Sequence, residues 1–136
     1  MRVRDYYIKD YDWRVTVYYA VTRYYISSIL EHLKAIRCPN AICDRVLYNL
    51  LSGDMNTGFT YTNNYWRKTI MVIGLSTSPA QFYNSLAHEQ RHLVDDIAEE
   101  FYMNFTGEQV AYLTGDFAMQ TLPDIYDLLC PACRCH

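Results

Sequence analysis

The sequence predicts an α+β domain, and three observations carry that prediction. One stretch near the N-terminus has the period of a strand, a central region resembles a hairpin of two strands, and four stretches have helical spacing. The predicted order is strand, helix, helix, hairpin, helix, helix. With 136 residues, of which 51% are hydrophobic, the chain has the size and apolar content of one domain with a real core.

The first half of the chain gives one strand and two helices. Residues 13–21 alternate with period two, which predicts a strand. One face of that strand is expected to hold Val15, Val17, Tyr19 and Val21. Residues 22–37 then carry apolar side chains at helical spacing, and Pro39 stops the helix. A second helix is expected from Asn40 until Gly53.

A hairpin follows, and after it a helix whose start is indicated by a capping pattern. Residues 57–62 and 66–75 have strand character and flank Asn63-Asn64, where asparagine tolerates the backbone of a tight turn. The segment 78–81 then reads Ser-Pro-Ala-Gln, which places a capping serine, a first-turn proline and a glutamine at the third position. We therefore predict that a helix begins here and that an antiparallel or mixed sheet packs on it.

The last helix is predicted from the capping pattern Thr106-Gly107-Glu108-Gln109. We place the domain at residues 1–123 and a cysteine-rich tail at 124–136, beyond Pro123. The tail contains the potential soft metal ligands Cys130, Cys133, Cys135 and His136. It is either a mobile thiol-rich terminus or a structural metal site that draws further ligands from Cys38 and Cys43.

Charge and composition exclude several classes. The formal net charge is −3, which argues against a non-specific nucleic-acid binder. The 14 tyrosines lack interleaved lysines and arginines, so we interpret them as strand and core-edge residues. No apolar run approaches the ~18 residues that span a bilayer, so no membrane association is expected. The N-terminus lacks the features of a secretory leader, which predicts a cytoplasmic protein.

The helix that begins near residue 78 contains the motif that carries chemistry. Residues 88–92 read His-Glu-Gln-Arg-His, which is the pattern H-E-x-x-H. His88 and His92 lie one helical turn apart on the same face, so both imidazoles can reach one Zn²⁺. Glu89 is placed to act as general base on a water held by that metal. The alternative interpretation is a solvated helix face with two incidental histidines.

A catalytic zinc usually takes a third protein ligand. Asp96, Glu99 and Glu100 lie about 10–12 Å along one continuous helix from one or other histidine, too far to join both. The ligand should come from an element that doubles back, and we select Glu108. This requires that the motif helix end soon after Asp96, or that the next helix cross it closely. The alternative role of Glu108 is a first-turn acid that complements the helix dipole.

These residues resemble a known family. The segment 88–96, followed by 107–112 with its glutamate, resembles the gluzincin branch of the zincin-fold metallopeptidases. The metzincin pattern is excluded, because Asp95 and Ala98 occupy the positions of its glycine and third histidine. The chain also resembles small zincin-like proteins of bacteriophages and mobile elements.

The resemblance implies a zinc-dependent metallopeptidase that acts on a peptide or protein substrate. His88, His92 and Glu108 would be the zinc ligands, and Glu89 would activate the water. The same residues fit a non-catalytic zincin-like module that binds a partner, such as a phage accessory or assembly component.

The resemblance also implies roles for neighbouring residues. An edge strand near residues 57–62 would hold an extended peptide by strand addition. Tyr112 is a candidate to stabilise the oxyanion. Asp95 and Asp96 are candidates to orient the imidazoles, or they are solvated helix acids.

Overall fold

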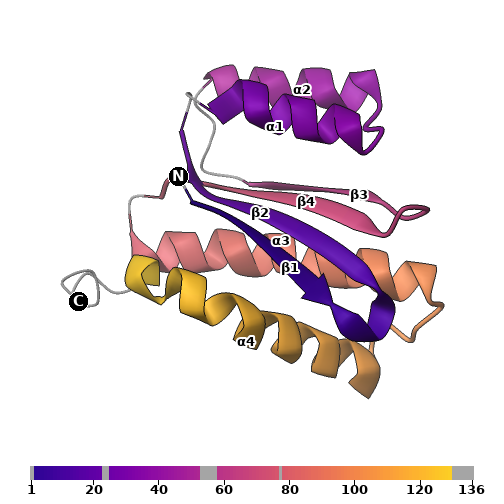
Figure 1. The fold of residues 1–136 in the computed structure, drawn as a ribbon. Helices are drawn as coiled ribbons and strands as arrows, with labels where there is room; N and C mark the ends of the chain where they lie inside the picture. The colour runs from indigo at the N-terminus through magenta and orange to yellow at the C-terminus, as the bar shows by residue number, and fades with distance from the viewer. Residues whose placement is uncertain (1, 23–24, 53–57, 77, 130–136) are drawn as a thin grey trace.

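The computed structural model describes residues 2–22, 25–52, 58–76 and 78–129. A four-stranded mixed sheet forms the middle layer, and a pair of helices covers each of its faces (Figure 1). The predicted α+β class is therefore confirmed. None of the described helices is long and apolar enough to cross a bilayer.

The sheet has the strand order β1-β2-β4-β3. Its strands are β1 (Arg2–Ile8), β2 (Trp13–Val21), β3 (Phe59–Asn63) and β4 (Lys68–Gly74). The central pair β2 and β4 is parallel, whereas β1 pairs with β2 and β3 pairs with β4 in antiparallel fashion. A short 3-10 turn, η1 (Lys9–Tyr11), joins β1 to β2. Strands β1 and β3 are therefore the two edges, and the expected edge strand near residues 57–62 is β3.

The helices form two layers with separate hydrophobic cores. One face of the sheet packs against α1 (Ile26–Ala35) and α2 (Asn40–Ser52), and the other against α3 (Pro79–Glu100) and α4 (Glu108–Leu129) (Figure 1). Ile29, Leu33 and Val46 belong to the first core, and Leu93 and Ile97 belong to the second. Strand β4 is buried from its second residue onward, as expected for a strand covered on both faces.

A bulge in β2 corrects one sequence-based expectation. The side chains that pack toward α3 and α4 are Trp13, Val15, Val17 and Tyr19. Val21, which was expected on that face, packs in the core beneath α1 and α2 instead. The cause is Ala20, which has a positive φ of 56° at a register shift between Tyr18 and Val21. The extra residue shifts the alternation of the strand, so Val21 points to the opposite face.

Strand β1 was not predicted, and contacts with the C-terminal helix explain why it forms. Arg2 makes two hydrogen bonds of 2.8 Å to the carboxylate of Asp127. Asp124 accepts a hydrogen bond of 3.0 Å from Arg4 Nε and one of 2.8 Å from the Tyr6 hydroxyl. The two arginines that obscure the strand pattern, Arg2 and Arg4, are therefore bonded to α4.

The same contacts correct the predicted start of the tail at residue 124. Helix α4 continues through Pro123 to Leu129. An internal proline removes one helical hydrogen bond and normally breaks or bends the helix. Here the turns after Pro123 are bonded to β1 through Asp124 and Asp127, so residues 124–129 belong to the domain.

Replacement of Asp124 by alanine is expected to lower the free energy of unfolding by about 1–3 kcal/mol, because it leaves the buried Tyr6 hydroxyl with one partner fewer. Urea denaturation of both proteins measures the difference. Asp44→Ala on α2 is the matched control, since Asp44 is exposed and should change stability by no more than about 0.5 kcal/mol. Equal stability losses in the two variants would contradict the role given to Asp124.

Candidate metal centre

Helix α3 positions the motif through its start and through its buried face. The Ser78 hydroxyl accepts a hydrogen bond of 3.2 Å from the Gln81 backbone N–H, and Pro79 opens the helix, as the sequence predicts. Leu86 and Leu93 are buried against the sheet. Packing of that stripe turns His88 and His92 outward, where both are exposed.

The two imidazoles converge on one point. His88 Nε2 and His92 Nε2 are 3.2 Å apart. Two nitrogens bound to one tetrahedral zinc at 2.0–2.1 Å would be about 3.3–3.4 Å apart. The nitrogen pair therefore fits a shared ion. Glu89 completes a group whose ligand atoms all lie within 4.8 Å of one another, so His88, Glu89 and His92 could together hold a metal ion.

Glu89 lies beneath the imidazoles on the buried side of the helix. Its carboxylate is 4.0 Å from His88 Nε2, and only 3% of the residue is exposed. Burial raises the pKa of Glu89, while the nearby His92 and His88 partly oppose that shift. A carboxylate with a raised pKa is a better proton acceptor in the catalytic range than an exposed one.

The edge strand β3 supplies a contact that sequence reasoning missed. Thr60 Oγ1 lies 3.4 Å from Glu89 Oε2 and 3.3 Å from the Glu89 backbone oxygen, close enough for its single hydroxyl to donate to both. Gly58, just before β3, lies close to the same side chain. A Cβ at this position would be 3.2 Å from Glu89 Cγ. The hairpin pattern was visible in the sequence, but nothing in it indicated which helix residue the strand would face.

The structure does not bring Glu108 into this group. Helix α3 continues past Asp96 to Glu100, so the early helix end, one of the two arrangements that would bring Glu108 to the histidines, does not occur. Helix α4 contacts α3 through Gln90, whose Nε2 donates a hydrogen bond of 2.7 Å to the Thr114 backbone oxygen. Gln90 lies about 160–200° around the helix from the two histidines, so the contact is on the side away from them.

The remaining candidate residues do not belong to the His88-Glu89-His92 group. Tyr112 is on the exposed side of α4, with 69% of the residue accessible. Asp95 forms an ion pair of 2.9 Å with Arg91. Asp96 is close to His92 and Thr62, and burial raises its pKa. Of the two acids proposed to orient the imidazoles, Asp96 is therefore the one that lies beside His92.

The cysteine motifs are separate from this group. The tail residues Cys130, Cys133, Cys135 and His136 lie outside the described part of the chain. Cys38 and Cys43 are buried free thiols, and Cys43 Sγ lies 3.7 Å from the Cys38 backbone oxygen. Burial raises the pKa of Cys38 to about 12, which keeps it protonated and disfavours metal binding.

The comparisons with known proteins give no family for this chain. No protein-family model, curated protein or solved structure matches it. The residues of the site and their geometry therefore carry the functional argument alone, and what they establish is a His-Glu-His group on α3 that could hold a metal ion.

Proposed function

We propose that the protein is a zinc-dependent hydrolase with a zincin-like fold, specifically a small metallopeptidase of the gluzincin type. The observation that carries the proposal is the 3.2 Å separation of the imidazole nitrogens of His88 and His92, with the buried carboxylate of Glu89 beside them. Two surface histidines without a shared ligand would have no reason to bring their Nε2 atoms together, or to lie next to a buried carboxylate.

Bound zinc would lower the pKa of a coordinated water to near 7 and polarise a substrate carbonyl. Glu89 would accept the proton of that water as its oxygen adds to the carbonyl carbon, and would pass the proton to the amine nitrogen as the C–N bond breaks. Thr60 holds the Glu89 carboxylate from the side of β3. The position of the Glu89 carboxylate is therefore restricted, because Thr60 donates a hydrogen bond to it and the residue is almost completely buried.

The edge strand β3 supports a peptide as the substrate. Within the described residues it pairs with β4 alone, so its other edge presents backbone N–H and C=O groups beside the helix that carries the motif. An extended peptide can add to such an edge as a further strand. Thr60 of β3 is hydrogen-bonded to Glu89, so a peptide along this edge passes close to the proposed base.

Exposure of the site favours the hydrolase over a non-catalytic module with an enclosed metal. The His88 side chain is 67% exposed, so the described residues leave the imidazoles open to water and substrate. An open coordination position is what separates catalytic from structural zinc sites.

Zinc content measured after equilibrium dialysis tests the proposal. We expect one zinc per wild-type chain, and its loss in His88→Ala and in His92→Ala, because each removes one of two convergent ligands. His32→Gln is the matched control, since His32 lies on α1 across the sheet and should keep the metal. Zinc retained in both motif variants but lost in Cys133→Ala would assign the metal to the tail and refute the proposal.

The third ligand needs its own measurement. Glu108 stays a prediction from the sequence, and Glu108→Ala tests it directly in the same dialysis experiment. Zinc content that falls as in His92→Ala would make Glu108 a ligand, and unchanged content would exclude it.

A further inference from the structure

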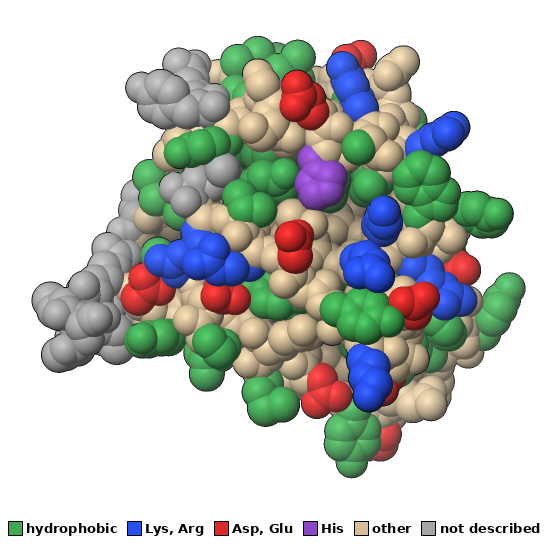
Figure 2. Space-filling model, in the orientation of Figure 1, with side chains coloured by type: hydrophobic (Ala, Val, Ile, Leu, Met, Phe, Trp, Pro, Cys, Tyr) green, Lys and Arg blue, Asp and Glu red, His purple; other side chains and the backbone are tan. Residues whose placement is uncertain are grey.

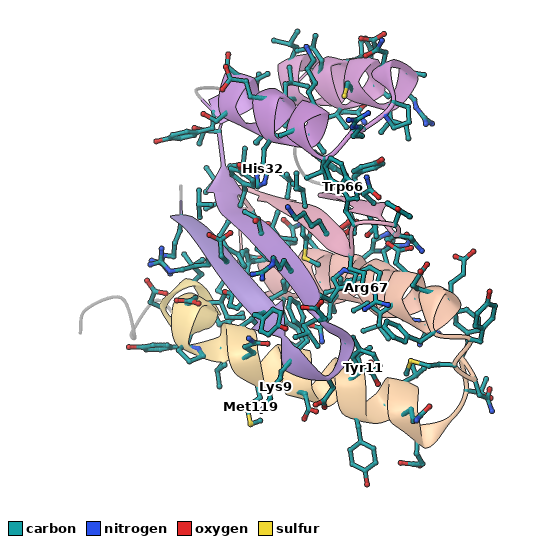
Figure 3. All side chains as sticks on the ribbon, turned by 45° about the vertical axis from the view of Figure 1, so that its right-hand side comes forward. Lys9, Tyr11, His32, Trp66, Arg67 and Met119 are labelled. Atoms are coloured by element: carbon teal, nitrogen blue, oxygen red, sulfur yellow. The ribbon has the colours of Figure 1, made fainter. Side chains whose placement is uncertain are left out.

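A pocket of about 360 Å³ lies across the sheet from the metal group. Strands β1, β2 and β4 form its floor and walls, and His32 of α1 lies between that helix and the strands (Figure 3). Figure 2 shows one face of the molecule, on which basic and acidic side chains lie close to one another. The volume falls within the range of small-molecule sites in proteins.

Two cations form one wall of this pocket. Arg14 and Lys68 are register partners on β2 and β4, so their side chains leave the same face of the sheet side by side. Each lies over an aromatic ring, Arg14 over Tyr7 at 5.1 Å and Lys68 over Trp66 at 5.8 Å. Neither belongs to an ion pair among the described residues. Like charges directly opposite each other destabilise a sheet, and an anion between them would relieve that cost.

The acid on the neighbouring edge strand, Asp5, is hydrogen-bonded to another residue and forms no ion pair with these cations among the described residues. Asp5 pairs with Thr16 across the strands, and its carboxylate accepts a hydrogen bond of 2.6 Å from the Thr16 hydroxyl. Arg14 is two residues from Thr16 along β2, so Asp5 and Arg14 are diagonal neighbours about 7–8 Å apart at their Cα atoms. The pocket therefore presents separated charges of both signs.

The other lining groups add little charge and some apolar surface. His32 Nδ1 is 2.9 Å from the Tyr18 hydroxyl, and burial lowers the pKa of His32, which keeps the ring neutral at pH 7. Ile36 and Ile70 are buried and line the pocket next to the charged groups. An anionic ligand alone would satisfy the two cations but would be repelled by Asp5, whereas a ligand with both charges and an apolar group matches every wall.

We propose that this pocket binds a small zwitterion, namely a free α-amino acid with an apolar side chain. The ligand carboxylate lies between Arg14 and Lys68, and its ammonium group is hydrogen-bonded to Asp5. The apolar side chain packs against Ile36 and Ile70. The proposal is independent of the metal group, because α3 contributes none of these residues.

Titration of the ¹⁵N-labelled full chain with L-leucine, followed by NMR, tests the proposal. L-leucine is expected to shift the amide resonances of β1, β2 and β4 around the pocket. N-acetyl-L-leucine lacks the cation and L-leucinamide lacks the anion, so each should bind about tenfold more weakly or worse. Absence of shifts with L-leucine up to tens of millimolar would overturn the proposal. Equal binding of either derivative, or tighter binding of inorganic phosphate, would also overturn it.

Variants then identify the residues that bind the probe. Arg14→Gln and Asp5→Asn should each weaken L-leucine binding about tenfold, because each removes one charged partner. Arg45→Gln removes the same charge from an exposed position on α2 and should leave binding unchanged. Circular dichroism confirms folding of each variant, and Lys68→Gln replaces Arg14→Gln if the latter does not fold. Unchanged affinity in the folded pocket variants would exclude this pocket as the site.

Discussion

Glu89→Gln is expected to lower peptide hydrolysis by the zinc-loaded protein about 10²- to 10⁴-fold, while the zinc stays bound. Glutamine has nearly the same shape as glutamate but cannot accept the proton of the attacking water. Because Glu89 lies 4.0 Å from His88 Nε2 and is buried, the substitution leaves the two imidazoles free to hold the ion.

The measurement is cleavage of casein peptides by mass spectrometry, with zinc content determined on the same samples. Gln90→Glu is not a suitable control, because Gln90 joins α3 to α4. Glu100→Gln near the end of α3 changes the same charge and should retain full activity. Wild-type turnover in zinc-loaded Glu89→Gln would refute the role of general base.

Gly58→Ala is expected to lower the free energy of unfolding by about 1–3 kcal/mol and to reduce hydrolysis as well. A Cβ at this position would lie 2.0 Å from the Val72 backbone oxygen, a separation that real atoms do not reach. The start of β3 must therefore move away from β4. Because Thr60 is two residues further on, the hydrogen bond to Glu89 would be disturbed by the same movement.

Urea denaturation and the peptide assay measure the two effects of this substitution. Gly115→Ala on α4 is the matched control, because a Cβ there meets nothing within 4 Å. Alanine is favoured over glycine inside a helix by about 0.5–1 kcal/mol, so this control should become more stable. Equal responses of the two glycines would show that the approach of β3 to β4 does not need Gly58.

The sequence predicted those parts of the site whose information is local. The adjacent residues Ser78 and Pro79 mark the start of α3. His88 and His92 share one face of the helix by periodicity alone. The 3.2 Å separation of their Nε2 atoms depends in addition on the side-chain rotamers, which periodicity does not specify. The hairpin was also visible, because strand patterns flank Asn63 and Asn64.

The features that sequence reasoning missed depend on contacts between distant segments. Strand β1 and the end of α4 stabilise each other through the ion pair between Arg2 and Asp127, which lie near opposite ends of the chain. The sequence pattern of either segment gives no indication of the other. The position of Glu108 relative to the histidines likewise depends on where α4 packs on α3. The assignment of Glu108 needed either a short motif helix or a close crossing of the next helix, and α3 continues to Glu100.

The parallel pairing of β2 with β4 has a consequence for how the chain folds. Trp13 Nε1 donates a hydrogen bond of 2.9 Å to Thr69 Oγ1, which is 56 positions later in the chain. Closing so long a loop costs chain entropy before any central contact forms, so we expect the β1–β2 hairpin and the α1–α2 pair to appear early. The middle of the sheet can assemble only after β4 has been synthesised, so the surface on which α3, the helix that carries the two histidines, packs is incomplete until then.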